Sequence, residues 1–393
     1  VAALVAPVGG TETVPLAAAD GRVLADTVLA PLDLPPFANS AVDGYAVHSA
    51  DLAPSGATRL PLGGRVAAGA DAAGFTARGL AIRVFTGAPM PPGADTVFMQ
   101  EDVTLEDGGV LLPAGLAPGA NARPAGEDIA RGAFAAAGQR LRPQDLALLS
   151  ALGVTQVVVR RRPRVAIFST GDELTEPGQP LGPAAIYDAN RALLRAMVAR
   201  AGAEVVDLGI LRDERAGLAQ RLAEAAASCD LVLTSGGVST GEEDHVKAAL
   251  EQVGELAFWR IGIKPGRPVA LGRIGMVPFI GLPGNPVAVF VTFAFVARVL
   301  IARLAGTAPV APLSLPVRLG FAYRKKEGRR EYVRVSLEPG PDGVQIARKH
   351  PQDGAGVLTS LTRTDGLVEL EEDMTRIEEG TIVPFLAYAL LIG

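Results

Sequence analysis

The sequence has little of what disulfide-rich folds and thiolate metal sites require. Its 393 residues include one cysteine, Cys229, and three histidines, His48, His245 and His350. A single cysteine excludes a disulfide framework and argues against a zinc site built on thiolates. The small number of histidines argues against a histidine-rich metal site in the same way.

Long uninterrupted hydrophobic runs are missing as well, and no targeting segment is expected. The longest apolar run begins at Val287 and is interrupted by Arg298 and Arg303, so we expect a buried core helix and no membrane span. Residues 1–7 contain no basic segment and no long apolar core, which predicts no secretory signal and a cytoplasmic protein. The formal net charge of −5 predicts no general attraction to nucleic acid or to an anionic membrane.

Glycine and proline, by contrast, are abundant, with 46 and 30 residues, and they favour turns and short strands. The hydrophobic share of 49% and the charged share of 20% are ordinary for a soluble globular protein. A chain of this length is expected to form about two to four domains. We predict a multidomain α/β protein with a mostly β N-terminal region of two subdomains over 1–162, an α/β domain over 163–306 and a small β-barrel-like domain over 312–393.

The stretch from Asp230 to Asp244 organises the rest of the chain. A short apolar run, Leu231 to Leu233, predicts a buried parallel strand, and paired glycines and a predicted helix follow it. This order presents backbone N–H groups and a helix N-terminus to an anion. Three carboxylates, Glu242 to Asp244, lie in the same loop and suggest a phosphate or oxyanion bound with a divalent cation. An ordinary tight turn explains this stretch equally well when it is taken alone.

From Arg164 onward, short apolar strands alternate with helices, which is typical of a doubly wound α/β domain. In such sheets, ligands bind beyond the carboxyl ends of the strands. We therefore expect the polar residues of the loops at these ends to lie at one edge of the sheet. These residues are Asp172, Glu173, Asp213, the segment from Ser235 to Asp244, and the segment from Lys264 to Arg267.

Other loops carry polar residues that admit a purely structural explanation. Asp43 belongs to a polar turn at Gly44, where such side chains usually satisfy backbone groups. The loop from Asn121 to Ile129 holds an arginine and two acids, which a surface ion pair would explain. The segment from Arg324 to Glu331 is expected to be a basic hairpin tip, compatible with a solvated positive loop.

Taken together and in order, several motifs resemble those of the molybdopterin molybdenumtransferases, a family that also includes the C-terminal domain of gephyrin. The resemblance covers nearly the whole chain. The motifs are Asn39-Ser40-Ala41-Val42-Asp43-Gly44-Tyr45-Ala46, Thr86-Gly87-Ala88-Pro89, Gly126-Glu127-Asp128, Ser169-Thr170-Gly171-Asp172-Glu173-Leu174, Gly236-Gly237-Val238-Ser239 with Asp244, Lys264-Pro265-Gly266-Arg267-Pro268, and Leu282-Pro283-Gly284-Asn285-Pro286.

The resemblance implies insertion of molybdate into adenylated molybdopterin, with release of AMP and of the molybdenum cofactor, assisted by a divalent cation, usually Mg²⁺. It also implies a homodimer whose site lies between the α/β domain of one subunit and other domains of its partner. Molybdopterin adenylyltransferase and acceptor molybdoenzymes are the protein partners that such a role suggests.

Residue by residue, the resemblance also implies a site. Glu173, Asp213 and Asp244 would bind the metal, directly or through water, and Asp43, Thr86 and Asp128 would join them in catalysis. This fits the chemistry, because a phosphoanhydride needs N–H donors, cations and a metal that neutralises developing charge. The residues implied for substrate binding are Arg123, Ser235, Gly236, Gly237, Ser239, Lys264, Arg267, Pro283, Pro286, Arg329 and Ser360.

The sequence departs from the family pattern at two positions, and three other functions are alternatives. Ala38 stands where the family usually has Asp, and Arg267 stands where it often has Lys, which keeps the charge but changes its shape. Molybdopterin adenylyltransferase shares the α/β fold but is a single short domain. A non-catalytic scaffold would not need the acidic set. The sequence does not favour a generic nucleotide enzyme, because it contains no Walker or dinucleotide fingerprint.

Overall fold

The structure is a computed structural model, and it describes residues 5–132, 135–211, 215–237 and 245–392. The chain forms two compact units. The first unit comprises Val1–Glu12, Gly21–Ala25 and Val159–Gly393, and the second comprises Thr13–Asp20 and Asp26–Val158.

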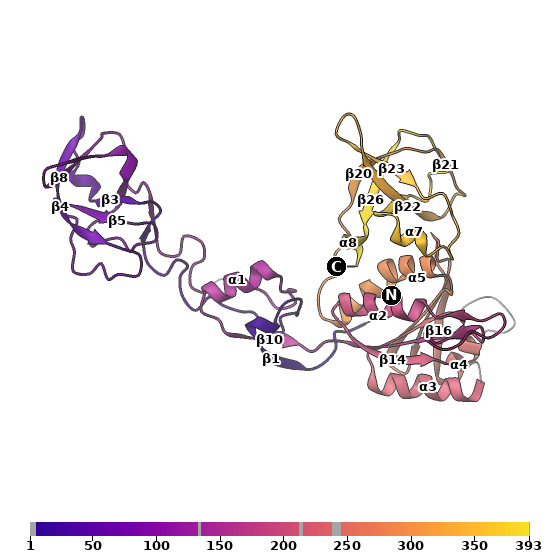
Figure 1. Cartoon of the computed structure of the whole chain (residues 1–393). Coiled ribbons are helices and arrows are strands. Elements are labelled where there is room, and N and C mark those ends of the chain that lie inside the picture. The colour runs from indigo at the N-terminus through magenta and orange to yellow at the C-terminus, as the bar shows by residue number, and fades with distance from the viewer. Residues whose placement is uncertain (1–4, 133–134, 212–214, 238–244, 393) are drawn as a thin grey trace. The chain divides into compact units, whose positions relative to one another are not determined.

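The second unit consists mainly of short strands, as its glycine and proline content predicts. Its larger sheet has six strands in the order β6-β3-β5-β4-β8-β7. Figure 1 labels four of them, β3, β4, β5 and β8. Gly44 in β3 has to be glycine, because a Cβ there would lie 2.9 Å from the carbonyl carbon of Phe98 in the neighbouring strand. The elements are β2 (Asn39–Ser40), β3 (Gly44–Val47), β4 (Thr58–Val66), β5 (Ala81–Val84), β6 (Thr96–Met99), β7 (Thr104–Glu106), β8 (Gly109–Leu112), β9 (Ala122–Arg123) and α1 (Pro143–Ala151), while β1 (Thr11–Pro15) pairs with β10 (Gln156–Arg160).

The alternating pattern from Arg164 onward forms a six-stranded sheet in the first unit, in the order β14-β11-β15-β19-β18-β16. The first four strands, β14 to β19 in this order, run parallel to one another. Strand β18 is antiparallel to β19, and β16 is antiparallel to β18. Helices α2 and α5 cover one face and α3 and α4 the other, which is the expected doubly wound arrangement (Figure 1). The elements are β11 (Arg164–Ser169), α2 (Asn190–Arg200), β14 (Glu204–Ile210), α3 (Arg215–Ser228), β15 (Leu231–Ser235), α4 (His245–Val253), β16 (Gly254–Arg260), β18 (Pro268–Ile274), β19 (Val277–Leu282) and α5 (Pro286–Thr292); β12 (Leu174–Thr175) pairs with β13 (Ile186–Tyr187).

The long apolar run becomes one helix, Pro286–Leu304, in which α5 continues through a π-helical turn (Phe293–Ala297) into α6 (Arg298–Leu304). This is the one helix among the described residues that is long and apolar enough to cross a membrane. However, 67% of its most apolar window is buried inside the protein, as in the core helix of a soluble protein. The predicted buried core helix is confirmed.

The C-terminal part of the first unit is a closed barrel of five strands. They follow one another in the order β22-β23-β20-β26-β24, and β24 pairs back with β22. The predicted β-barrel-like module is therefore confirmed. The strands are β20 (Leu315–Leu319), β22 (Arg330–Pro339), β23 (Gln345–Lys349), β24 (Gly366–Leu370) and β26 (Ile382–Ala387), and the short helices are α7 (Thr359–Thr362) and α8 (Tyr388–Leu391).

The expected basic hairpin from Arg324 to Glu331 is wrong. A short strand, β21 (Tyr323–Arg324), pairs with β25 (Arg376–Ile377), and β22 begins only at Arg330. The strands before and after the segment, β20 and β22, are not neighbours in the barrel. Alternating residues predict a strand but carry no information about its partner, so a connection between two sheets was mistaken for a hairpin.

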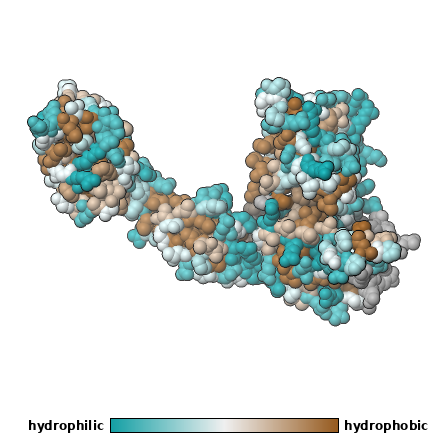
Figure 2. Space-filling view, in the orientation of Figure 1, coloured by the Kyte–Doolittle hydropathy of each residue, from teal (hydrophilic) through white to brown (hydrophobic). Residues whose placement is uncertain are grey.

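The barrel packs on the helical layer of the α/β sheet. Phe295 stacks on Tyr332 with ring centroids 4.2 Å apart, and Phe290 meets Tyr388 edge to face at 5.1 Å. In addition, a short strand, β17 (Ile263–Lys264), runs parallel to β22. Figure 2 shows hydrophobic residues gathered along this boundary. The barrel is thereby fixed beside the loops that leave the sheet.

Candidate active site

The glycine loop after β15 lies at the carboxyl edge of the sheet, as predicted. Gly236 and Gly237 have φ values of +86° and +64°, which favour glycine. A Cβ at Gly237 would lie 2.6 Å from the hydroxyl of Thr170 and closer still to Val246. Ser235 is buried just before the loop. The backbone can therefore approach a ligand closely here, and a larger residue cannot replace the second glycine without displacing its neighbours.

Loops from three parallel strands meet at this edge. The Gly236 N–H donates to the carbonyl of Leu282, at the end of β19, at 3.1 Å, and the Thr170 N–H donates to Ser235 at 3.2 Å. A Cβ at Gly284 would lie 3.9 Å from the Cα of Gly236. The turn from Pro283 to Pro286 thus borders the glycine loop, and the predicted convergence of these loops is observed.

Several buried hydroxyls at this edge have no hydrogen-bond partner among the described residues. They are the side-chain oxygens of Ser169, Thr170 and Thr234. The amide oxygen of Asn190 is likewise unpaired, although its nitrogen donates to Gly284 at 2.6 Å. Buried polar atoms normally have partners, so such a group indicates a place for a polar ligand or water. Thr170 and Asn190 were not among the predicted site residues.

Glu173 supplies a carboxylate that is unpaired within the described part of the chain. Its side chain is exposed and lies over Gly171, where a Cβ would come within 2.8 Å of the carboxylate carbon. The nearby acids behave differently, because Glu176, Asp188 and Asp207 all pair with Arg191. Burial alone would lower the pKa of Arg191, but the three carboxylates outweigh burial, and the pKa lies above its ordinary value. The Glu173 carboxylate is therefore available to a cation, as far as the described residues are concerned.

The remaining predicted metal ligands, Asp213 and Asp244, lie outside the described residues, as does Ser239. Within the described ranges, no group of three or more candidate ligands could hold a metal. The residues that are present fit Mg²⁺ in donor type, because Glu173 is a hard oxygen ligand beside a backbone anion cradle.

A cluster of cations stands where the barrel meets the α/β domain. The Lys264 ammonium lies 3.0 Å from Glu331, and the Arg329 guanidinium lies 3.4 Å from the other oxygen of the same carboxylate. Arg267 is exposed and has no ion-pair partner among the described residues. Between Lys264 and Arg267, Gly266 has a φ of +111° and packs against α5 at Thr292. The cluster is thereby tied to the same helix that begins at Pro286.

Barrel loops reach this region too. The Val287 N–H, in the first turn of α5, donates to the carbonyl of Ala355 at 3.0 Å. Arg334 is buried and donates to the carbonyls of Gln352 and Gly354, which holds this loop in place. Ser360 follows in α7, fully buried, with its hydroxyl donating to Val357 at 2.6 Å. Ser360 can therefore offer a ligand only its lone pairs unless that bond breaks.

Four predicted site residues lie in the second unit. The Asp43 carboxylate accepts hydrogen bonds from the backbone and the hydroxyl of Thr86, at 2.7 and 2.8 Å, and these bonds lower its pKa. Asp43 is therefore ionised at neutral pH. Arg123 pairs with Glu127 at 2.5 Å on the surface, and the backbone of Asp128 is bonded to Leu34. The turn and ion-pair chemistry considered as structural alternatives is present at both loops.

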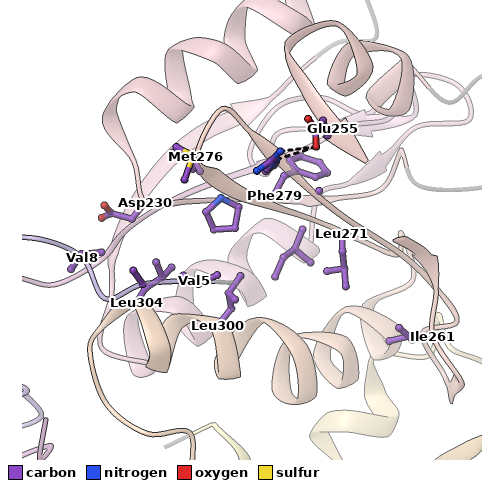
Figure 3. A pocket seen from close by; sticks show the side chains of 16 residues that line it. Val5, Val8, Asp230, Glu255, Ile261, Leu271, Met276, Phe279, Leu300 and Leu304 are labelled. Carbon is purple, nitrogen blue, oxygen red and sulfur yellow. Dashed lines mark hydrogen bonds and ion pairs between the residues drawn. The ribbon is translucent and has the colours of Figure 1, made fainter. Parts of the chain in front are cut away.

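An apolar pocket of about 850 Å³ lies elsewhere in the first unit. Figure 3 shows Leu300 and Leu304 of α6 on one side and Leu271 and Phe279 of the β18–β19 hairpin on the other. Asp230, the residue just before β15, marks this as the amino edge of the sheet, opposite the glycine loop. The charged groups at its rim are already paired, so the pocket offers little chemistry.

Models of known protein families match three regions of the chain. The MoeA N-terminal region (domain I and II) matches residues 1–153, a probable molybdopterin binding domain matches residues 166–303, and the MoeA C-terminal region (domain IV) matches residues 316–388. Together these matches extend over most of the sequence.

Individual relatives agree with these matches. A molybdopterin molybdenumtransferase of Haemophilus influenzae is 36% identical over 386 residues, which cover 98% of this chain and 95% of that protein. A protein of the same name from Nostoc is 37% identical over 385 residues, 94% of this chain and 87% of that protein. The crystal structure of the molybdopterin biosynthesis MoeA protein from Pyrococcus horikoshii superposes with a TM-score of 0.82 at 31% identity, covering 98% and 96% of the two chains. The chain therefore belongs to the MoeA family of molybdopterin molybdenumtransferases.

Proposed function

We propose that this protein is a molybdopterin molybdenumtransferase, which acts in molybdenum cofactor biosynthesis by inserting molybdate into adenylated molybdopterin and releasing AMP. Relatives of that name match nearly the whole chain. The matches to the N- and C-terminal regions do not favour a single-domain adenylyltransferase. One structural observation supports the chemistry: a backbone anion cradle, a carboxylate without a partner among the described residues and a cluster of cations lie around one edge of the sheet and the start of one helix.

Different residues of this edge are suited to bind different parts of the substrates. The Gly237 N–H and the Thr170 hydroxyl, which has no partner among the described residues, are suited to the phosphates of the adenylated substrate. Lys264, Arg267 and Arg329 are suited to the molybdate dianion, because ammonium and guanidinium groups make charge-assisted hydrogen bonds to oxyanions. Asp213 and Asp244, together with Glu173, would hold Mg²⁺. When bound, that ion neutralises charge that develops as the phosphoanhydride breaks.

An AMP-release assay tests this proposal and the role of Glu173 together. Wild type should release AMP from adenylated molybdopterin only with both molybdate and Mg²⁺, and EDTA should abolish release. Glu173→Gln should lower the rate about a hundredfold at limiting Mg²⁺ and less at high Mg²⁺. Glu176→Gln is a matched control, because it removes an acid of the same loop that is already paired with Arg191. A folded wild-type protein that releases no AMP would refute the proposal.

We further propose a homodimer in which Asp43, Thr86, Arg123 and Asp128 of one subunit complete the site of the other. A mixing experiment tests it. Asp43→Asn and Lys264→Ala should each be inactive alone. If each site combines two subunits, equimolar mixing gives hybrids with one intact site in two, or about a quarter of wild-type activity. No recovery on mixing, with subunit exchange shown by mass spectrometry of a tagged variant, would place both residues in the same subunit's site.

Location and protein partners are proposed on the same basis. An enzyme of this pathway is expected in the cytoplasm, where it would receive substrate from a molybdopterin adenylyltransferase and pass its product to acceptor molybdoenzymes. Cell fractionation tests the location. Co-purification of the tagged protein with a tagged adenylyltransferase tests the partnership, and it should weaken when either substrate site is mutated.

A further inference from the structure

Glu331 is a buried carboxylate at the centre of the cation cluster. It is the second residue of β22, and its side chain is 1% exposed. Lys264 donates to one carboxylate oxygen at 3.0 Å, and Tyr323 donates to the same oxygen at 3.0 Å. The second oxygen faces Arg329 at 3.4 Å. Neither the family resemblance nor the predicted site assigned this residue a role.

The partners of Glu331 come from three separate segments. Lys264 lies in β17, Tyr323 in β21, and Arg329 just before β22. The parallel pairing of β17 and β22 sets Lys264 directly beside Glu331. Burial and the neighbouring carboxylate raise the pKa of Tyr323, so its hydroxyl keeps its proton and donates to Glu331. The carboxylate is thus fixed by strand register on one side and by a permanent donor on another.

Both cations keep part of their surface outside this contact. The Lys264 side chain is 50% exposed and the Arg329 side chain 27% exposed, whereas Glu331 is closed off from solvent. The buried Nε of Arg329 has no hydrogen-bond partner among the described residues. Lys264 has three donors and Arg329 has five, so each can bind Glu331 and an external anion at once. The carboxylate therefore lies behind the two cations.

We propose that Glu331 is a positioning residue for the anion site: it holds Lys264 and Arg329 at a fixed spacing, so that they receive the molybdate dianion without rearrangement. This inference rests on the proposed function. A buried ion pair is weak evidence for stability in itself, because desolvation offsets much of the attraction. Its contribution here is to preorganise two flexible side chains, whose immobilisation would otherwise oppose binding.

The test compares Glu331→Gln with Glu369→Gln. Glu369 offers matched chemistry on the neighbouring strand, because it accepts from Arg330 at 2.9 Å and from Tyr332 at 3.2 Å but contacts neither Lys264 nor Arg329. For each variant, the KM for molybdate and kcat come from AMP release. The Kd for molybdate alone comes from titration calorimetry without the second substrate.

Glu331→Gln should raise the KM and the Kd for molybdate about tenfold, because two side chains must then be ordered by the anion. Its kcat at saturating molybdate and its KM for adenylated molybdopterin should stay near wild type. Glu369→Gln should leave all four constants unchanged. Unchanged molybdate constants in folded Glu331→Gln would overturn the proposal. Tighter molybdate binding would also overturn it, since Glu331 would then merely offset positive charge.

A second variant covers the case in which Glu331→Gln does not fold. Tyr323→Phe removes one fixed donor and leaves the carboxylate in place. It should raise the molybdate KM about threefold, and an unchanged KM would overturn the proposal. Failure of the proposed function would look different: wild type would release no AMP, whatever molybdate binding calorimetry detected.

Discussion

The two edges of the six-stranded sheet differ in chemistry although the same strands form both. The carboxyl edge presents left-handed glycines, together with hydroxyls and a carboxylate that have no partner within the described ranges of the chain. The amino edge presents an apolar pocket of about 850 Å³, whose rim acids are paired: Asp230 with Arg161, and Glu255 with Arg273. An oxyanion needs N–H donors and cations. The chemistry therefore favours the carboxyl edge as the binding site, because the loops that follow the parallel strands lie there.

The largest effect on activity is expected at the carboxyl edge. Gly237→Ala places a Cβ against Thr170 and Val246 at a φ of +64°. The loop must shift, and a shift of about 1 Å at a binding loop costs about a hundredfold in rate. AMP release measures the loss, and circular dichroism checks the fold. Gly275→Ala, at a positive φ with open space around it, is the matched control and should keep its activity.

A substitution at the amino edge should lower stability and leave activity unchanged. Leu304 is buried beside the pocket, and Leu304→Ala should lower the free energy of unfolding by about 2 kcal/mol, near the low end for such changes because space already exists there. Urea denaturation measures it. The kcat of the folded variant should equal that of wild type. A loss of activity as large as that of Gly237→Ala would mean that the apolar pocket takes part in the reaction.

Replacing Asp230, at the same edge, should have a smaller effect on the free energy of unfolding, and this effect should depend on pH. Burial alone would raise its pKa, but hydrogen bonds from Arg161 and the Arg164 backbone outweigh it, so the pKa lies below its ordinary value of 3.8. The stabilisation is therefore present above about pH 4 and is lost as the pH falls through the lower folded pKa. Asp230→Asn should cost about 1 kcal/mol at pH 7, because Arg161 is partly exposed, and less at pH 3. Equal costs at both pH values in urea titrations would contradict this.

The smallest effect is expected at Met276, which is 89% exposed at the tip of the β18–β19 hairpin. Met276→Gln should change the free energy of unfolding by less than about 0.5 kcal/mol and leave AMP release unchanged. Thermal denaturation and the AMP assay check both. A clear change in oligomeric state or activity would show that the pocket rim serves as a contact surface, and the contrast between the edges would weaken.

The sequence predicted much of this site because its signals are local. Strand, glycine turn and helix follow one another in the segment around Gly236, and the same order recurs around Pro283, so strand direction alone places both loops at one edge. The turn at Asp43 could likewise be predicted from local sequence. Thr170 and Asn190 were missed because nothing local shows that their polar atoms lack partners. The predicted domain boundaries near 162 and between 306 and 312 stay predictions.

The sequence by itself determined which segments become strands and where glycine and charge occur, because apolar periodicity and turn chemistry act over a few residues. Only the tertiary structure decided that β22 pairs with β17 and that Glu331 therefore lies beside Lys264, 67 residues earlier. An alternating strand can pair with many partners, and one acid among several can meet a given lysine. Packing of the whole barrel on the α/β helices selects the register, and with it the carboxylate that orders the cation cluster.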